Sequence, residues 1–198
     1  MRGASPVGVV LAGGRGRRLG GDKAIVELEG RALVHYPVTA LREVCDDVAV
    51  VAKRDTLLPP MSGVADLWIE PDEPRHPLVG VAHALGLAVG RPVLVVAVDL
   101  PLVDAATLRT IAEAPLRPGE TVAAPRPYGR LQPLCALYTP EALAAGLDRF
   151  DPSARATAVV EALGVHVVDG VDEELFLNVN APEDVLRASV SVRRASPR

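Results

Sequence analysis

Residues 7–23, VGVVLAGGRGRRLGGDK, join a short apolar run to a loop rich in glycine and positive charge. The run at 7–12 is largely β-branched, as is typical of a strand buried on both faces of a sheet. Five glycines and four cationic residues follow it. Glycine allows backbone amides to approach a ligand closely, and successive amides can bind an anion. The stretch therefore predicts a strand that leads into a phosphate-binding loop.

Two commoner phosphate loops do not fit this stretch. The dinucleotide-binding pattern GxGxxG requires its third glycine where Leu19 stands. The P-loop requires Gly-Lys followed by Ser or Thr, whereas Asp22 precedes Lys23 and Ala24 follows it. Lysine occurs elsewhere only at Lys53, in a chain that otherwise uses arginine. This usage indicates that a compact ammonium, which acts on phosphate as a point charge, is required at position 23.

Composition limits the class of protein. The 198 residues carry a net charge of −4, which argues against nucleic-acid binding because such proteins usually have a basic face. Cys45 and Cys135 are interpreted as reduced core thiols rather than metal ligands. We see no signal peptide and no membrane-spanning run, so we expect a cytoplasmic protein without membrane partners. One domain is expected over residues 1–188, followed by a polar, basic, frayed tail over 189–198.

Strand and helix patterns alternate through the first half of the chain. The expected strands are residues 7–12, 48–52, 66–69 and 93–98, and the expected helices are 33–44, 81–89 and 105–114. This alternation predicts an α/β fold, a mostly parallel sheet with helices on both faces. Later, residues 122–124 and 134–138 predict an antiparallel pair, 140–150 and 156–163 predict helices, 165–168 predicts a strand, and a last helix starts near Pro182.

Asp99 is the second residue with expected chemistry, because it directly follows the most apolar strand. Ligands of such sheets bind beyond the carboxyl ends of strands, so Asp99 and the loop at 11–23 should converge. A carboxylate at the end of a buried strand is costly to ionise without a positive partner. Mg²⁺ is a suitable partner, because it binds a few carboxylates together with substrate phosphates. The alternative is a cap for the next helix, and the neighbouring phosphate loop favours the metal ligand.

The loop resembles LAGGxxxRxGGxDK, the signature of the molybdenum cofactor guanylyltransferase family of nucleotidyltransferases, with one residue fewer before Asp22. Shorter motifs of the family follow in the family's order: PLVG at 77–80, DLP at 99–101, QPL and ALY within 132–138, and LNVNAPED at 177–184. The resemblance implies a Rossmann-like three-layer α/β sandwich of the nucleotide-diphospho-sugar transferase type. It includes a mostly parallel sheet with a small antiparallel extension.

The resemblance also implies a reaction, the transfer of GMP from GTP to the terminal phosphate of molybdenum-bound molybdopterin, with pyrophosphate released. It implies a requirement for Mg²⁺, held by Asp99 with Asn180 as a direct ligand or a neighbour of one. Charge on the phosphates would be stabilised by Arg18 and Lys23, which with Asp99 form the implied catalytic set. The implied nucleotide-binding residues are Leu11, Ala12, Gly13, Gly14, Lys23, Asp72 and Asp99. Molybdoenzymes or cofactor-insertion proteins are the implied protein partners.

The choice of nucleotide base depends on residues in the first two expected strands and the loops that follow them. Val51 stands where we align an asparagine of many family members, and Lys53 is expected to be a solvated surface lysine rather than its replacement. A cytidylyl or sugar-phosphate nucleotidyltransferase of the same fold is the alternative. Gly13-Gly14 favours guanylyl transfer, because cytidylyl relatives tend to have LAAG. A non-catalytic nucleotide-binding module is a second alternative, although a mere binder would not need Asp99.

The remaining polar residues receive no role from the sequence. The four histidines, His35, His76, His83 and His166, lie in unlike segments without metal-ligand spacing. Arg126 and Arg155 are interpreted as ordinary surface arginines rather than contacts of a pterin phosphate.

Overall fold

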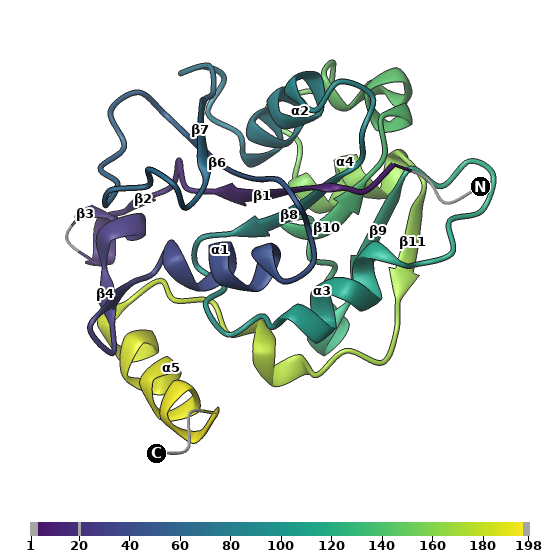
Figure 1. The fold of residues 1–198 in the computed structure, drawn as a ribbon. Coiled ribbons are helices and arrows are strands. Elements are labelled where there is room, and N and C mark those ends of the chain that lie inside the picture. Colours follow the sequence, from purple (N-terminus) through teal and green to yellow (C-terminus); the bar gives the residue numbers. More distant parts are fainter. Residues whose placement is uncertain (1–3, 20, 196–198) are drawn as a thin grey trace.

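A computed structural model describes residues 4–19 and 21–195 of the chain. Its centre is a seven-stranded sheet with the order β11-β9-β10-β8-β1-β6-β7 (Figure 1). The strands are β1 (Val7–Leu11), β6 (Val48–Ala52), β7 (Asp66–Ile69), β8 (Val93–Ala97), β9 (Val122–Pro125), β10 (Cys135–Tyr138) and β11 (Val165–Val168). Only β10 runs antiparallel to its neighbours in this sheet. The mostly parallel sheet with an antiparallel extension is therefore confirmed.

Helices cover both faces of the sheet, which gives three layers (Figure 1). One face packs against α1 (His35–Arg42) and α3 (Ala105–Ala112), while α5 (Pro182–Ala195) lies beside the short strand β4 (Glu27–Leu28). The other face packs against α2 (Pro77–Leu87), α4 (Ala156–Ala162) and the π-helical turn η4 (Leu143–Leu147). Successive strand residues point to opposite faces, so both layers bury apolar side chains of every central strand.

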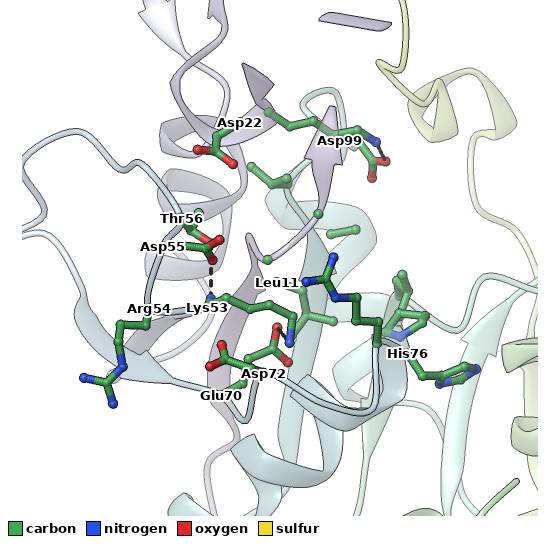
Figure 2. Close-up of a pocket in the computed structure, with 18 residues that line it drawn as sticks. Leu11, Asp22, Lys53, Arg54, Asp55, Thr56, Glu70, Asp72, His76 and Asp99 are labelled. Atoms are coloured by element: carbon green, nitrogen blue, oxygen red, sulfur yellow. Dashed lines mark hydrogen bonds and ion pairs between the residues drawn. The ribbon is translucent and has the colours of Figure 1, made fainter. Parts of the chain in front are cut away.

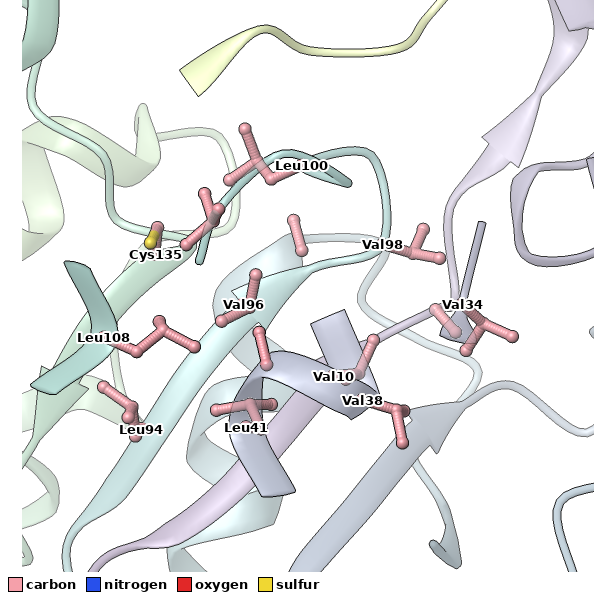
Figure 3. Close-up of a cluster of buried hydrophobic side chains, with 14 of the residues drawn as sticks. Val10, Val34, Val38, Leu41, Leu94, Val96, Val98, Leu100, Leu108 and Cys135 are labelled. Atoms are coloured by element: carbon pink, nitrogen blue, oxygen red, sulfur yellow. The ribbon is translucent and has the colours of Figure 1, made fainter. Parts of the chain in front are cut away.

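The central strands show this two-sided burial directly. Val10 and Val96 pack beneath α1 and α3 together with Leu41 and Leu108 (Figure 3). The adjacent Val9 belongs to the cluster beneath α2 on the opposite face. An unbroken run of apolar residues is required for such strands, and this is the pattern of residues 7–12 and 93–98 in the sequence.

The segment between β1 and α1 forms two small hairpins beside the sheet. The first pairs β2 (Arg15–Gly16) with β3 (Gly21–Asp22), with the 3-10 turn η1 (Arg17–Leu19) between them. The second pairs β4 (Glu27–Leu28) with β5 (Arg31–Ala32), after the 3-10 turn η2 (Lys23–Ile25). Its turn places Glu29 and Gly30 at φ values of 51° and 74°, as a two-residue hairpin of this hand requires.

Three elements differ from the sequence expectations. Helix α2 begins at Pro77 instead of 81, because proline suits a first helical position and His76 caps the helix by accepting from Leu78 N. The helix expected at 140–150 is shortened to residues 141–147, of which the last five form η4, since Gly146 adopts a φ of 115°. Helix α5 continues to Ala195, so residues 189–195 are helical and not the expected frayed tail.

Helix α5 is held to the β4–β5 hairpin by an ion pair. Arg193 of α5 donates from Nε and one terminal nitrogen to the two carboxylate oxygens of Glu29, at 2.8 and 2.9 Å. Gly20 of the glycine-rich loop and residues 196–198 of the expected tail lie outside the described residues. Within the described part of the chain, no helix is long and apolar enough to span a membrane.

Candidate active site

A cavity of about 700 Å³, the first cavity, opens at the carboxyl ends of β1, β6, β7 and β8 (Figure 2). Each of these four strands supplies a residue at or just beyond its end: Leu11, Lys53, Glu70 and Asp99. Gly13 and Gly14 of the loop after β1 complete this part of the wall. The expected convergence of the glycine-rich loop with Asp99 is confirmed.

Lys23 and Asp99 meet at one end of the first cavity, the Lys23 end. The Nζ of Lys23 lies 2.7 Å from Oδ2 of Asp99, and the two side chains are 14% and 18% exposed. The same Nζ donates to Oδ1 of Asn180 at 2.5 Å. A largely buried carboxylate needs a positive partner, and Lys23 supplies it here. Lys23 and Asp99 thus form a charged pair on the cavity wall, and the amide of Asn180 contacts this pair from outside the wall.

Asn180 is brought to this pair by the segment before α5. The backbone N–H of the buried Val179 donates to the carbonyl oxygen of Asp99 at 2.8 Å. The carboxylate of Asp184 then accepts from the backbone N–H groups of Asn180 and Ala181, at 3.0 and 2.9 Å. These bonds fix the turn into α5 against the end of β8, so the amide of Asn180 faces Lys23.

The opposite end of the first cavity, the Lys53 end, contains Lys53, Glu70 and Asp72 (Figure 2). Lys53 Nζ lies 3.4 Å from Oε1 of Glu70 and donates to the carbonyl oxygen of Pro71 at 2.7 Å. The side chains of Lys53 and Glu70 are only 15% and 9% exposed, so the expectation of a solvated surface lysine was wrong. Burial raises the pKa of Glu70, and the charge of Lys53 opposes that shift.

Comparison with known proteins identifies the family. A family model described as the MobA-like NTP transferase domain matches residues 8–167. The chain belongs to this family. A molybdenum cofactor guanylyltransferase of Cereibacter sphaeroides is 36% identical over 197 residues, which cover 94% of this chain and 97% of the relative. The family makes the chain a nucleotidyltransferase, as the resemblance of its loop implied.

Solved structures agree with this fold. The molybdopterin-guanine dinucleotide biosynthesis protein A of Archaeoglobus fulgidus superposes with a TM-score of 0.76 at 23% identity, covering 95% of this chain and 99% of that one. The 2-C-methyl-D-erythritol 4-phosphate cytidylyltransferase of Thermus thermophilus superposes with a TM-score of 0.66 at 21% identity, covering 93% and 98%. At these identities the likeness shows a shared nucleotidyltransferase fold, which cytidylyl-transferring proteins also adopt.

The structure places the residues that the family resemblance implied as follows. Those that line the first cavity are Leu11, Gly13, Gly14, Lys23, Asp72 and Asp99. Ala12 is fully buried, and its N–H donates to Val51 O at 2.8 Å, so it supports the loop from beneath. Arg18 lies on η1 with an exposed side chain and is not part of the cavity wall. The roles assigned to all of these residues remain predictions.

Glu70 is the site residue that sequence reasoning missed. It directly follows the short strand at 66–69, just as Asp99 follows the strand at 93–98. The same rule that singled out Asp99, a carboxylate at the carboxyl end of a parallel strand, would have selected Glu70 as well. The three prolines at positions 71, 74 and 77 drew attention instead to the loop that follows.

The Lys23 end has donors of the kind that Mg²⁺ prefers. The carboxylate of Asp99 and the amide oxygen of Asn180 both contact one ammonium, so both point at a common position. Among the described residues, no three or more His, Cys, Asp or Glu side chains are grouped so that they could hold a metal ion. A single carboxylate with an amide oxygen suits a Mg²⁺ ion that takes its remaining ligands from water and nucleotide phosphates. The residues present therefore fit this ion.

A second cavity of about 460 Å³ adjoins the first at Asp99. The two cavities share the wall residues His76, Pro77, Ala97, Asp99 and Leu134. Arg155, expected to be an ordinary surface arginine, is exposed but lines this second cavity. Arg126 instead lies near Glu161, with 3.4 Å between the charged groups. Two substrates bound in the two cavities would thus meet beside Asp99.

Proposed function

We propose that this nucleotidyltransferase transfers GMP from GTP to the terminal phosphate of molybdenum-bound molybdopterin and releases pyrophosphate. The names of the relatives that share most of the chain support this substrate pair. The observation that carries the proposal is the 2.7 Å contact between Lys23 Nζ and Asp99 Oδ2 on the wall of the first cavity. This contact brings together the cation that we propose to bind phosphate and the carboxylate that we propose to hold a metal ion.

The reaction requires positioning and charge neutralisation more than proton transfer. An oxygen of the acceptor phosphate attacks the α-phosphorus of GTP, and the bond from that phosphorus to the bridging oxygen of pyrophosphate breaks. The attacking oxygen is already anionic, so no strong general base is needed. Lys23 is proposed to neutralise charge on the α-phosphate, and such preorganised charges are the main source of rate enhancement in this kind of site. Arg18 is proposed to assist from η1.

Asp99 and Asn180 are proposed to hold Mg²⁺. When bound, the ion would neutralise part of the negative charge of the triphosphate. The N–H of Val179 on the carbonyl oxygen of Asp99 keeps the amide of Asn180 next to that carboxylate. This backbone contact links the segment before α5 to the reacting end of the cavity.

The nucleoside is proposed to extend from the Lys23 end toward the Lys53 end. Leu11 and Gly13 would contact it from the end of β1, and Asp72 would reach it from the loop after β7. The acceptor is proposed to occupy the second cavity, where Arg155 would face its phosphate. This placement uses the shared wall at Asp99, because both substrates must reach the same phosphorus.

The test is direct transfer by the purified chain. We expect GTP labelled at the α-phosphate, with Mg²⁺ and molybdenum-bound molybdopterin, to give a labelled dinucleotide cofactor and one pyrophosphate for each transfer. CTP serves as the comparison, because cytidylyl transfer is the alternative on this fold. Equal or faster transfer from CTP would contradict the guanylyl assignment, and no transfer from either nucleotide would contradict the function.

The reaction is proposed to occur in the cytoplasm. The buried thiols of Cys45 and Cys135 are unpaired, as is usual for proteins of a reducing compartment. Cofactor-insertion proteins or molybdoenzymes are proposed to receive the product.

A further inference from the structure

We propose that Glu70 is a positioning residue that fixes the ammonium of Lys53 at the base end of the first cavity, where that ammonium selects guanine. The inference rests on the proposed function in one respect only, that a nucleotide binds with its base at the Lys53 end. It also names the residues that choose the base. The names of the relatives do not identify those residues.

The place of Glu70 is set by two glycines from distant parts of the chain. A Cβ added to Gly13, in the loop after β1, would overlap Oε1 of Glu70. A Cβ added to Gly80, in α2, would lie 2.8 Å from Oε2 of Glu70 and 3.0 Å from Cδ2 of Leu11. Neither glycine has a positive φ, so backbone conformation does not require glycine at either position. The missing side chains make room for the carboxylate of Glu70.

This carboxylate in turn fixes Lys53. With 9% of the Glu70 side chain exposed, the carboxylate requires a charged partner, and Lys53 Nζ lies 3.4 Å from its Oε1. The carbonyl oxygen of Pro71 accepts from the same ammonium at 2.7 Å. An ammonium has three N–H donors, so these two partners leave one for a ligand in the cavity. The ammonium of Lys53 is thus a hydrogen-bond donor at a fixed position and does not move freely like a surface cation.

A held ammonium distinguishes nucleobases by their acceptors. Guanine presents O6 and N7 as neighbouring acceptors along one edge, whereas adenine replaces O6 with an amino donor and cytosine presents an amino donor. An ammonium hydrogen-bonds the guanine edge and opposes an amino group at the same place. Hypoxanthine keeps O6 and N7, so an ammonium should accept it as well as guanine. Discrimination by one such contact is typically on the order of ten- to a hundredfold.

The experiment measures the dissociation constants of GTP, ITP, ATP and CTP with Mg²⁺ by calorimetry, without an acceptor. We expect wild-type protein to bind GTP and ITP alike and at least about tenfold more tightly than ATP or CTP. Glu70→Gln, which keeps the shape but removes the charge, and Lys53→Met should each reduce this preference by about tenfold. Glu73→Gln is the matched control, because Glu73 lies in the same loop with a side chain that is 70% exposed.

A second pair of variants tests the two-glycine account of Glu70 without touching its side chain. Gly80→Ala should displace the carboxylate and reduce the preference for GTP over ATP, as Glu70→Gln does. Gly86→Ala, in the same helix with open space around its Cα, should leave the preference unchanged. Urea unfolding of each variant shows whether it is folded, and Lys53→Met provides the measurement should Glu70→Gln not fold.

The outcomes separate the two proposals. Equal weakening of all four nucleotides in Glu70→Gln and Lys53→Met would mean a merely structural role and would overturn this inference. Retention of the preference in Lys53→Met would also overturn it. A wild-type protein that prefers GTP in calorimetry but transfers no GMP would refute the proposed function and leave base selection by Lys53 intact.

Discussion

Lys23 Nζ lies 2.7 Å from Oδ2 of Asp99, although the two residues are 76 positions apart in the sequence. The same ammonium contacts Oδ1 of Asn180, so it occupies the point toward which both oxygen donors are directed. The cation that is proposed to act on phosphate and the residues that are proposed to hold Mg²⁺ are therefore partners of each other before any ligand binds.

We expect Lys23→Ala and Asp99→Ala each to reduce GMP transfer by about a hundredfold or more, because each removes one charge that is proposed to face the reacting phosphates. Transfer of α-labelled GMP to the acceptor measures this. Asp148→Ala is the control, because Asp148 is 48% exposed and pairs with the neighbouring Arg149. Near wild-type turnover by either Lys23→Ala or Asp99→Ala would remove that residue from the mechanism.

We expect Lys23→Met to bind Mn²⁺ more tightly than wild type when no nucleotide is present. The ammonium of Lys23 contacts both Asp99 and Asn180, so it competes with a dication for the same oxygens. Titration of free Mn²⁺ by electron paramagnetic resonance measures the affinity. Asp99→Asn should abolish this binding in both backgrounds. Unchanged or weaker binding by Lys23→Met would show that lysine and metal do not exchange at this site.

The buried carboxylate of Glu70 should make stability depend on pH. Burial raises its pKa above the value in the unfolded chain, with Lys53 and His83 opposing the shift and Asp72 adding to it. The folded state therefore keeps the proton of Glu70 to a higher pH than the unfolded state does. The stability that this protonation contributes is lost as the pH rises through the pKa of the folded state.

Urea unfolding between about pH 4 and pH 7 tests this sign, with Glu70→Gln as the comparison. We expect the free energy of unfolding of wild type to fall relative to Glu70→Gln as the pH rises from the ordinary glutamate range. A difference that stays constant would show that Lys53 offsets the effect of burial on the ionised carboxylate, and one that grows in favour of wild type would show that Lys53 outweighs it; either would contradict the expectation.

We expect His76 to support both the start of α2 and the wall of the second cavity, because its ring contacts both. Its Nδ1 accepts from Leu78 N at 3.2 Å and its Nε2 lies 3.2 Å from the carbonyl oxygen of Ala154, next to Arg155. We expect His76→Ala to cost about 1 kcal/mol for the lost cap and to raise the KM for the acceptor.

His76→Asn separates these two effects. Asparagine can cap a helix but does not reach Ala154, so we expect near wild-type stability in urea together with a raised acceptor KM. A normal acceptor KM in both variants would mean that His76 serves only the helix.

The parts of the fold that were predicted correctly depend on continuous local patterns. The strands at 48–52, 66–69 and 165–168 match the structure because each is a short, mostly apolar segment with clear ends. The helix expected at 140–150 is present but ends at 147, because Gly146 takes a left-handed backbone. Residues 189–195 are helical although polar, since one side of α5 packs on the molecule and Arg193 pairs with Glu29.

The site, like the fold, was predicted from the sequence only in part. That Lys23 and Asp99 meet followed from topology, because parallel strands bring their carboxyl ends to one edge of the sheet. That Glu70 is buried could not be read from its own neighbours in the sequence. Its burial depends on the absent side chains of Gly13 and Gly80, which come together only in the folded molecule.

The pairing of Lys23 with Asp99 has a consequence for selectivity in a cell, where inorganic phosphate is abundant. A cation that is already matched by a carboxylate has little net attraction for a lone anion, so orthophosphate or sulfate alone gains little by entering. A nucleotide that arrives with its own dication brings a new partner for each member of the pair at once. We therefore expect the resting pair to favour binding of the intact metal–nucleotide complex over binding of a lone anion.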